Sequence, residues 1–505
     1  MLTDQPSQIP HSRRTLGSRF AVSPLGSQQT PLSRRNFLSW VGHGLASASL
    51  ASLLLKDNFL HATAIPGEPP RRCPHFLPKA RRAIHICLCG AMSQVDTFDH
   101  KPELARFHGK SLQSDEKPDV FFGQVGLLRQ SDWAFKRRGQ SGLWVSDLFP
   151  HIAQCADELT VINSMFAETS NHTPATFQQN TGFRLNGFPT LGAWLSFGLG
   201  SETDNLPAYV VIPDVREFPA GGSINWSNGF LSARHQGVVI RGSGNPIDDL
   251  FPAQPMPPGA DRATRDLLTA MNQRHLAEQG GGDALSARIR GYELAAKMQL
   301  AVPEVTDVTG ESERTREMYG LNGKATADFG RSCLLARRLI ERGVRFVQLF
   351  SGGTFGSPRR NWDGHEDMVA NHSQEARRID QPVAALLKDL RQRGMLDDTL
   401  VLFTTEFGRT PFTQSAANVV GKGRDHNQYG FSVWLAGAGL KSGLTYGATD
   451  EIGWKAAINP TPWYDFHATV LHLLGIDHER LTYYHNGIQR RLTNVHGKVI
   501  KELLL

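Results

Sequence analysis

Residues 383–411 constrain the fold of this chain more than any other segment. Their first part has apolar residues at helical spacing and stops at Gly394, which predicts an amphipathic helix. Two aspartates then form a turn before residues 399–405, whose continuous apolar character predicts a buried strand. That strand delivers Glu406 into a glycine-containing loop. Because ligand sites in open α/β sheets gather at the carboxyl ends of strands, Glu406 is well positioned to hold a metal ion.

Similar apolar runs recur along the chain. Strands are predicted at residues 81–89, 159–164, 208–213, 345–350 and 432–436, and helices at residues 191–199 and over most of 261–345. Apolar strands that alternate with amphipathic helices indicate an α/β fold. We therefore expect a mostly parallel central sheet covered by helices on both faces.

Composition indicates a globular protein without an electrostatic case for nucleic-acid binding. Apolar residues make up 40% and charged residues 20% of the chain, which are globular values. The net charge is +6, and the first 64 residues hold six basic against two acidic side chains, a net of +4. The remaining +2 is too weak and scattered to predict a nucleic-acid partner.

The first 64 residues predict an export signal. Residues 33–38 have a twin-arginine pattern, residues 41–55 are weakly apolar, and residues 62–64 form a small-x-small cleavage site. The apolar run is too short to span a bilayer comfortably. An amphipathic helix or an uncleaved anchor is the alternative. We expect the twin-arginine export machinery as a partner, a periplasmic or secreted location, and no stable membrane span in the mature chain.

The expected organisation has three parts. Residues 1–64 form the signal peptide and residues 65–80 a linker. Residues 81–505 form a single domain, with an irregular and helical insertion at about 214–340. The start of that insertion is rich in Gly, Pro and Asn, which are loop-forming residues.

Four segments place acids or histidines beside the ends of predicted strands. An isolated acidic loop residue is usually only solvated, but four comparable placements favour convergence at one edge of the sheet. Oxygen and imidazole ligands suit Zn, Mn, Mg or Ca. The expected ligands of a divalent metal are Asp96, Asp363, His365, Glu406 and His426.

A fifth segment, residues 169–176, precedes a helical run. Its hydroxyls and His172, near a helix start, can bind an anion through free backbone N–H groups. Ordinary N-capping by Ser170 or Thr173 is the alternative, and chemistry alone favours it.

Together these motifs resemble a family of exported bacterial proteins known as DUF1501, a sulfatase-like branch of the alkaline phosphatase superfamily. The resemblance spans nearly the whole mature chain and rests on motifs that include SQVDTFDHKPEL, NHTPATFQQNTGF, NWDGH, TTEFGRTP and GRDHN. It implies an alkaline phosphatase/sulfatase-like fold. The family has no settled activity, so expectations about chemistry come from the superfamily.

The resemblance also implies roles for the candidate ligands. Asp96 matches the first metal-binding acid of the superfamily, and Asp363 with His365 resembles a later acid-and-histidine pair. Glu406 matches the acid of a D-H or D-N pair, and His426 matches the last metal histidine.

Two departures from the superfamily pattern concern catalysis. His172 stands where a Ser, Thr or formylglycine nucleophile is expected, with Thr173 adjacent, and Phe407 replaces the second member of the D-H or D-N pair. No C-x-P-x-R sequence is present, so a formylglycine-type sulfatase is not expected. The expected catalytic residues are His172 and Thr173.

Two functions are compatible with these features. The first is a metal-dependent hydrolase of phosphate or sulfate esters, attacked by water or Thr173 with His172 as base or further ligand. Its substrate would be an anionic small-molecule or glycan ester bound by Asn171, Arg409 and Arg424. The alternative is a catalytically silent exported protein of the same fold that recognises an anionic glycan or an envelope partner. The two departures favour this alternative, while the retained ligands favour the hydrolase.

Overall fold

The computed structural model describes residues 73–505, except residues 114–117, 249–258, 281 and 356–358. The expected signal peptide, residues 1–64, lies outside the described residues. Residues Arg71–Leu505 form one compact unit. Within the described residues, every helix is too short or too polar to cross a membrane. The domain boundaries that we expect stay predictions.

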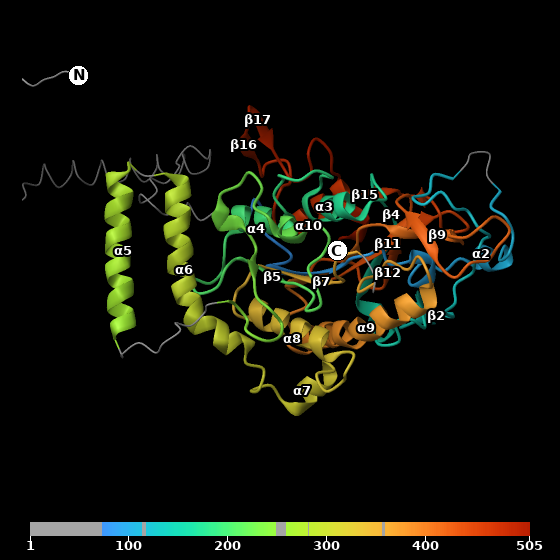
Figure 1. Cartoon of the computed structure of the whole chain (residues 1–505), viewed down its shortest axis with the longest axis horizontal. Helices are drawn as coiled ribbons and strands as arrows, with labels where there is room; N and C mark the ends of the chain where they lie inside the picture. Colours follow the sequence, from blue (N-terminus) through green and yellow to red (C-terminus); the bar gives the residue numbers. More distant parts are fainter. Residues whose placement is uncertain (1–72, 114–117, 249–258, 281, 356–358) are drawn as a thin grey trace, which may run out of the picture. The chain divides into compact units, whose positions relative to one another are not determined.

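A nine-stranded sheet forms the centre of this unit (Figure 1). Across the sheet its strands are β12 (Leu444–Tyr446), β4 (Leu159–Phe166), β11 (Phe431–Gly437), β8 (Thr399–Thr405), β1 (Arg82–Leu88), β7 (Phe346–Ser351), β5 (Tyr209–Ile212) and β6 (Val238–Val239), and β15 (Thr461–Pro462) pairs with β4. Within this sheet only β11 runs against its neighbours, β4 and β8. The expectation of a mostly parallel sheet is confirmed, and all six predicted apolar runs are strands of it.

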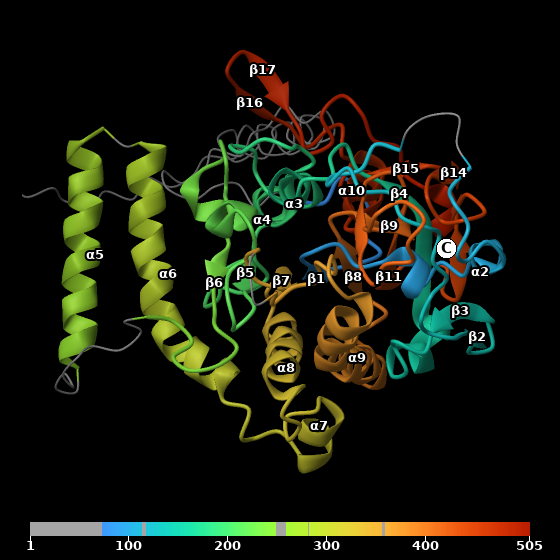
Figure 2. The ribbon, with the colours of Figure 1, turned by 45° about the vertical axis from the view of Figure 1, so that its right-hand side comes forward.

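Helices cover both faces of the sheet, as expected. One face carries α8 (Ala327–Glu341) and α9 (Met368–Gln392), and the other carries α3 (His172–Thr181), α4 (Leu191–Leu199) and α10 (Trp463–Leu473), as Figures 1 and 2 show. Successive side chains of a strand point to opposite faces. In β1, Ile84 and Ile86 therefore join the core under α8 and α9, while Ala83 and Cys87 join the core under α4 and α10.

The segment expected as an insertion, at about 214–340, contributes to the sheet as well as extending from it. It contains η3 (Gly222–Trp226), η4 (Ala233–His235), β6, α5 (Ala260–Glu278), α6 (Asp283–Thr306), α7 (Glu313–Met318) and α8. In this segment α5 packs on α6, and α6 packs on η4 and α8.

Shorter elements complete the unit. Before α3 the chain forms η1 (Gln94–Asp96), α2 (Pro102–Arg106), the hairpin β2 (Phe135–Arg138) with β3 (Leu143–Ser146), and η2 (Ile152–Glu158). Towards the C-terminus, β13 (Ala448–Thr449) pairs with β14 (Ala456–Ile458), β16 (Tyr483–His485) pairs with β17 (Ile488–Arg490), and η5 (Lys501–Leu503) follows.

One antiparallel ribbon corrects the sequence interpretation. The loop expected after Glu406 and the segment before β11 pair with each other as β9 (Gly408–Thr413) and β10 (Arg424–Asn427). In this ribbon Arg409 lies opposite His426. The two segments were expected as loops because each is short and polar. Their mutual hydrogen bonds satisfy the backbone groups that a buried loop would leave unpaired.

The strand directions decide which segments meet at one edge of the sheet. The carboxyl ends of β1, β4, β7 and β8 share that edge because these strands are parallel. Since β11 is antiparallel, its amino end, which follows β10, lies at the same edge. The segments that carry Glu406, His426 and the residues just after β4 and β7 are therefore neighbours.

Candidate metal centre

Four buried side chains meet at this edge: His172, Asp363, His365 and His426. One possible ligand atom from each lies within 4.8 Å of the others. His172 is the first residue of α3, which follows β4, and His426 lies in β10. Asp363 and His365 come from the connection between β7 and α9. The fold therefore brings together three expected metal ligands and the histidine at the expected nucleophile position.

Each imidazole in the group donates a hydrogen bond from Nδ1 to an oxygen atom. His172 donates to Glu406 Oε1 at 2.7 Å, His426 to the backbone oxygen of Ser170 at 2.6 Å, and His365 to Gln414 Oε1. These partners accept hydrogen bonds, so they place the hydrogen on Nδ1. In this tautomer of an imidazole, Nε2 carries a lone pair. Metal-binding histidines have this arrangement, with an oxygen acceptor fixing the ring that coordinates the ion.

The three Nε2 atoms point to a common centre. His365 Nε2 lies 2.8 Å from His426 Nε2 and 2.7 Å from Asp363 Oδ1. The Nε2 atoms of His172 and His426 each lie 3.3 Å from the same carboxylate oxygen. Among the described residues, His172 Nε2 is buried without a hydrogen-bond partner. Lone pairs that face each other across such distances repel, and a cation held between them relieves that repulsion.

The donor atoms fit a metal ion. Tetrahedral zinc with bonds of about 2.0–2.1 Å holds its ligand atoms about 3.3 Å apart. Four of the separations between donor atoms are 2.7–3.3 Å, which comes close to this spacing, and all of the donor atoms lie within 4.8 Å of one another.

The electrostatic environment keeps Asp363 and His426 in their ligand forms. Burial raises the pKa of Asp363, but the charge of the Arg409 guanidinium opposes it, and the pKa lies well below its usual range. Burial lowers the pKa of His426 well below its usual value, against the opposing effect of Asp363. At neutral pH the carboxylate is therefore ionised and the His426 imidazole is neutral.

Asp96 does not join the group, which corrects its expected role as a ligand. Its carboxylate is fully buried and accepts from Arg424 Nε at 2.9 Å and from the Ser93 hydroxyl at 2.6 Å. Burial raises its pKa, but the Arg424 charge and the Ser93 hydrogen bond lower it further, for a net decrease. A buried guanidinium needs a counter-charge, and Asp96 supplies it.

Arg424 is also unsuited to its expected role of binding an anionic substrate. Besides Asp96, its guanidinium donates to the backbone oxygens of Thr410, Pro411, Arg129 and Gln130, at 3.0–3.2 Å. All its donor groups are occupied by the protein. Arg424 therefore fixes β9 and β10 to neighbouring segments instead of facing a ligand.

Arg409, like Arg424, is unsuited to its expected role of binding an anionic substrate. Its guanidinium is fully buried and donates to Asp363 Oδ1 at 2.6 Å, to the backbone oxygen of Ala91 at 2.9 Å and to that of Gly90. It also lies 3.4 Å from His365 Nε2. Arg409 therefore neutralises a candidate ligand, and the structure gives it no free donor for a substrate anion.

Glu406 lies outside the group and contacts it through His172, so its expected role as a metal ligand stays a prediction. Its Oε1 atom accepts from His172 Nδ1 at 2.7 Å and from the backbone N–H of Gly90 at 2.8 Å. A carboxylate in this position fixes the ring orientation and increases the basicity of the coordinating nitrogen.

Asn171 and Thr173 flank His172 at the start of α3. Asn171 is the N-cap residue, and its exposed side chain makes no capping hydrogen bond. Thr173 is half-buried in the first helical turn. Capping by Ser170 or Thr173 is therefore not observed. The expected roles of Asn171 in substrate binding and of Thr173 in attack stay predictions.

Phenylalanine rings around the imidazoles were missed by sequence reasoning. Fully buried Phe407 packs on His172 and His426, with ring centroids 4.9 and 4.8 Å apart, which explains an apolar residue at this position. Phe121 and Phe122 pack on the group from a distant loop. The signal in the sequence that could have indicated these rings was the pair of adjacent phenylalanines, Phe121 and Phe122, within a polar segment.

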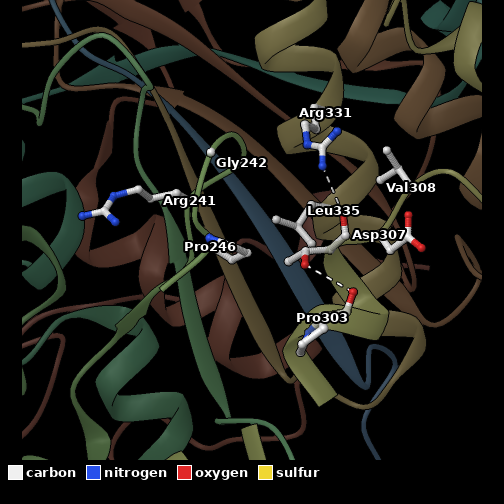
Figure 3. A pocket seen from close by; sticks show the side chains of 10 residues that line it. Arg241, Gly242, Pro246, Pro303, Asp307, Val308, Arg331 and Leu335 are labelled. Atoms are coloured by element: carbon white, nitrogen blue, oxygen red, sulfur yellow. Dashed lines mark hydrogen bonds between the residues drawn. The ribbon is translucent and has the colours of Figure 1, made fainter. Parts of the chain in front are cut away.

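A cavity elsewhere contains arginines but no convergent anion site. It has a volume of about 270 Å³ and lies between α6, α8 and the segment after β6 (Figure 3). Arg331 donates to the backbone oxygen of Thr306 at 3.2 Å. Arg241 points away from the cavity in Figure 3 and pairs with Asp248 at 2.6 Å. The two guanidiniums therefore do not face a common ligand.

Comparison with known proteins identifies a family and several similar structures. The model of a family described as "Protein of unknown function (DUF1501)" matches residues 80–504. A comparison with curated proteins gives no match.

Three similar solved structures come from bacteria. The lipoteichoic acid synthase LtaP from Listeria monocytogenes is 11% identical, with 83% of this chain and 76% of that chain covered and a TM-score of 0.33. The PsFucS1 sulfatase from Pseudoalteromonas sp. is 11% identical, with 79% and 68% covered and a TM-score of 0.33. The C-terminal periplasmic domain of EcEptC from Escherichia coli, in complex with Zn, is 10% identical, with 81% and 86% covered and a TM-score of 0.32. Similarity at this level does not define the chemistry of this chain.

Proposed function

This chain belongs to the DUF1501 family, and we propose from its candidate metal centre that it is a metal-dependent hydrolase of phosphate or sulfate esters. The observation that carries the proposal is the convergence of three imidazole Nε2 atoms on the Asp363 carboxylate in a buried group. His172, Asp363, His365 and His426 would hold the ion.

The donor set favours a transition metal. Mg, Ca and Mn prefer sites made of oxygen atoms, whereas imidazole suits Zn. Three of the four donor atoms here are imidazole nitrogens. Of the four metals expected from the sequence, we therefore propose Zn.

The surrounding residues suit a hydrolytic site of this kind. The bound metal would supply a Lewis acid that polarises an ester oxygen and lowers the pKa of water. Glu406 holds His172 in the tautomer with a free Nε2 atom, and Arg409 keeps Asp363 ionised. Because an imidazole from the ligand group occupies the expected nucleophile position, we propose attack by water. Thr173 is the alternative nucleophile.

Metal analysis and a substrate screen test this proposal. The purified protein is expected to contain about one equivalent of metal and to hydrolyse at least one of nitrophenyl phosphate, a nitrophenyl phosphodiester and nitrophenyl sulfate. His365→Ala should lose both metal and turnover, and Thr173→Ala should keep both. His478→Ala is the matched control, since this buried histidine bonds Thr493 outside the group. A protein that binds no metal would refute the proposal.

A second candidate is a metal-holding binding protein without turnover. It is favoured by the burial of the ligand group and by the full use of Arg409 and Arg424 within the protein. Bound metal without turnover of any ester in the screen would support this function. Its ligand would be an anionic glycan or an envelope partner.

We also propose export by the twin-arginine machinery to the periplasm or the medium. The pattern at residues 33–38 supports this proposal. Replacing Arg34 and Arg35 by lysine should retain the full-length protein in the cytoplasm. Unchanged export of that variant would contradict the proposed route.

A further inference from the structure

Three phenylalanine rings from two loops surround the outer side of the ligand group. Phe355 stacks on His172 with ring centroids 3.9 Å apart. Phe121 packs on His426 at 4.7 Å, and Phe122 meets His365 edge-on at 4.8 Å. Each candidate imidazole ligand thus contacts a phenyl ring from outside the strands.

Phe121 and Phe122 differ from the buried ring beneath the group. These two residues are 45% and 52% exposed, whereas Phe407 is fully buried. Phe407 already shields His172 and His426 from the core side. Two adjacent, half-exposed phenyl rings are therefore not needed for that shielding, and they present an apolar surface to solvent beside His365 and His426.

Hydrogen bonds hold this exposed pair over the group. The backbone N–H of Phe122 donates to Asp425 Oδ2 at 2.9 Å, and the Tyr429 hydroxyl donates to Asp119 Oδ2 at 2.8 Å. Both anchors lie beside His426 in the chain. The rings are thus positioned by the segment that also supplies a ligand.

The charged groups next to the centre do not offer an alternative means of recognition. Arg409 and Arg424 are used within the protein, as described above. Arg359 pairs with Asp363 and with Glu366, the latter at 2.6 Å. A ligand that reaches the centre therefore meets phenyl faces beside it and guanidiniums that already have carboxylate partners.

We propose that Phe121 and Phe122 form a specificity-determining wall that holds the apolar face of a ring in the ligand. This inference rests on the proposed metal centre, which would receive the anionic group of the same ligand. The ligand class is a monoanionic or dianionic ester of a ring-bearing alcohol, with an aryl ring and a sugar ring as the two possible sources of the apolar face. Phenyl rings stack on such faces without needing a charge.

Binding of non-hydrolysable phosphonates to the metal-loaded protein tests this wall. Isothermal calorimetry would compare phenylphosphonate, a glucosyl phosphonate and methylphosphonate. Stacking on two rings predicts that a ring-bearing phosphonate binds about tenfold more tightly than methylphosphonate. The double variant Phe121→Ala, Phe122→Ala should lose most of this preference, with methylphosphonate affinity and metal content unchanged. Which ring is preferred distinguishes an aryl from a sugar source.

Phe76→Ala is the matched control, because Phe76 is also an exposed ring packed on a histidine, His472, at 4.8 Å, outside the ligand group. It should keep the preference. Three results would refute the proposed role of Phe121 and Phe122. They are equal affinity of the wild type for all three phosphonates, no binding of any of them, and a ring preference that the double variant keeps. Calorimetry needs no turnover, so a wild type that prefers rings but hydrolyses nothing would refute the hydrolase and support the wall.

Discussion

Replacement of Glu406 tests whether this residue binds the metal directly or instead orients His172, which would bind it. In the structure its carboxylate receives hydrogen bonds from His172 Nδ1 and from the Gly90 backbone. Glu406→Ala removes the acceptor that fixes His172. Glu406→Gln keeps an acceptor oxygen in a side chain of the same shape. The two variants should therefore differ, whereas two changes of a direct carboxylate ligand would both remove the metal.

The magnitudes follow from the contacts. Loss of a partner that orients a ligand typically weakens metal binding by about 10- to 100-fold, which we expect for Glu406→Ala. Four-ligand zinc sites have apparent binding free energies of about 10–16 kcal/mol, or about 3 kcal/mol for each ligand, so His365→Ala should lose more than about 100-fold. Glu406→Ala also leaves the buried Gly90 N–H unpaired, which costs about 1–3 kcal/mol of stability.

Competition with a chromophoric zinc chelator would measure these affinities, with urea unfolding of the metal-free variants alongside. The expected order of affinity is wild type, Glu406→Gln, Glu406→Ala and His365→Ala. Glu375→Gln is the control, because Glu375 is an equally buried carboxylate that pairs with Arg216 at 2.8 Å, away from the centre. It should lose stability and keep metal affinity. Unchanged metal affinity of Glu406→Ala would refute the role of Glu406 in orienting His172, and a loss equal to that of His365→Ala would make Glu406 a direct ligand.

Three further predictions concern stability. Arg424→Met leaves Asp96 buried without its counter-charge, so urea unfolding should show a loss of about 3–5 kcal/mol, and a loss near zero would contradict the ion pair. Burial raises the pKa of Asp214, but the hydrogen bond from Arg216 and the charges of Arg378 and Arg216 lower it to about 2. Because the folded pKa lies below the unfolded value of about 4, Asp214 contributes about 2 kcal/mol above pH 4 and loses it as the pH falls through 2. Asp214→Asn should therefore be less stable than wild type at pH 7 and lose that difference in acid, whereas a constant difference would refute this account. Removal of metal with a chelator should lower the unfolding midpoint, and free zinc at 100 times its Kd should restore about 2.7 kcal/mol; an unchanged midpoint would argue against a metal centre.

Much of the sheet could be predicted because its strands are buried on both faces. Such strands read as continuous apolar runs, and β8 and α4 have the bounds that the sequence predicts. The placement of Asp363, His365 and His426 at one edge followed from the ends of these runs. The ribbon of β9 and β10 was missed because its strands are short and polar, with no apolar run to mark them.

The candidate site was only partly predictable for a different reason. Asp96 and Glu406 are both carboxylates that follow a predicted strand, as metal ligands in such a fold do. Their hydrogen-bond partners, Arg424 and His172, come from segments more than 200 residues away. A carboxylate can serve a metal, an arginine or a histidine, and proximity alone decides between them.

The amino-acid sequence by itself determined the strand and helix pattern and the edge of the sheet where acids and histidines gather, because periodicity and burial are local properties of the chain. The tertiary structure alone decided that His172, and not Asp96, lies with Asp363, His365 and His426, that Arg409 and Arg424 bond within the protein, and that Phe121 and Phe122 pack on the imidazoles. These choices depend on distances of a few ångströms between segments that are remote in sequence. Hydrogen bonds and ion pairs change from strong to negligible over that range.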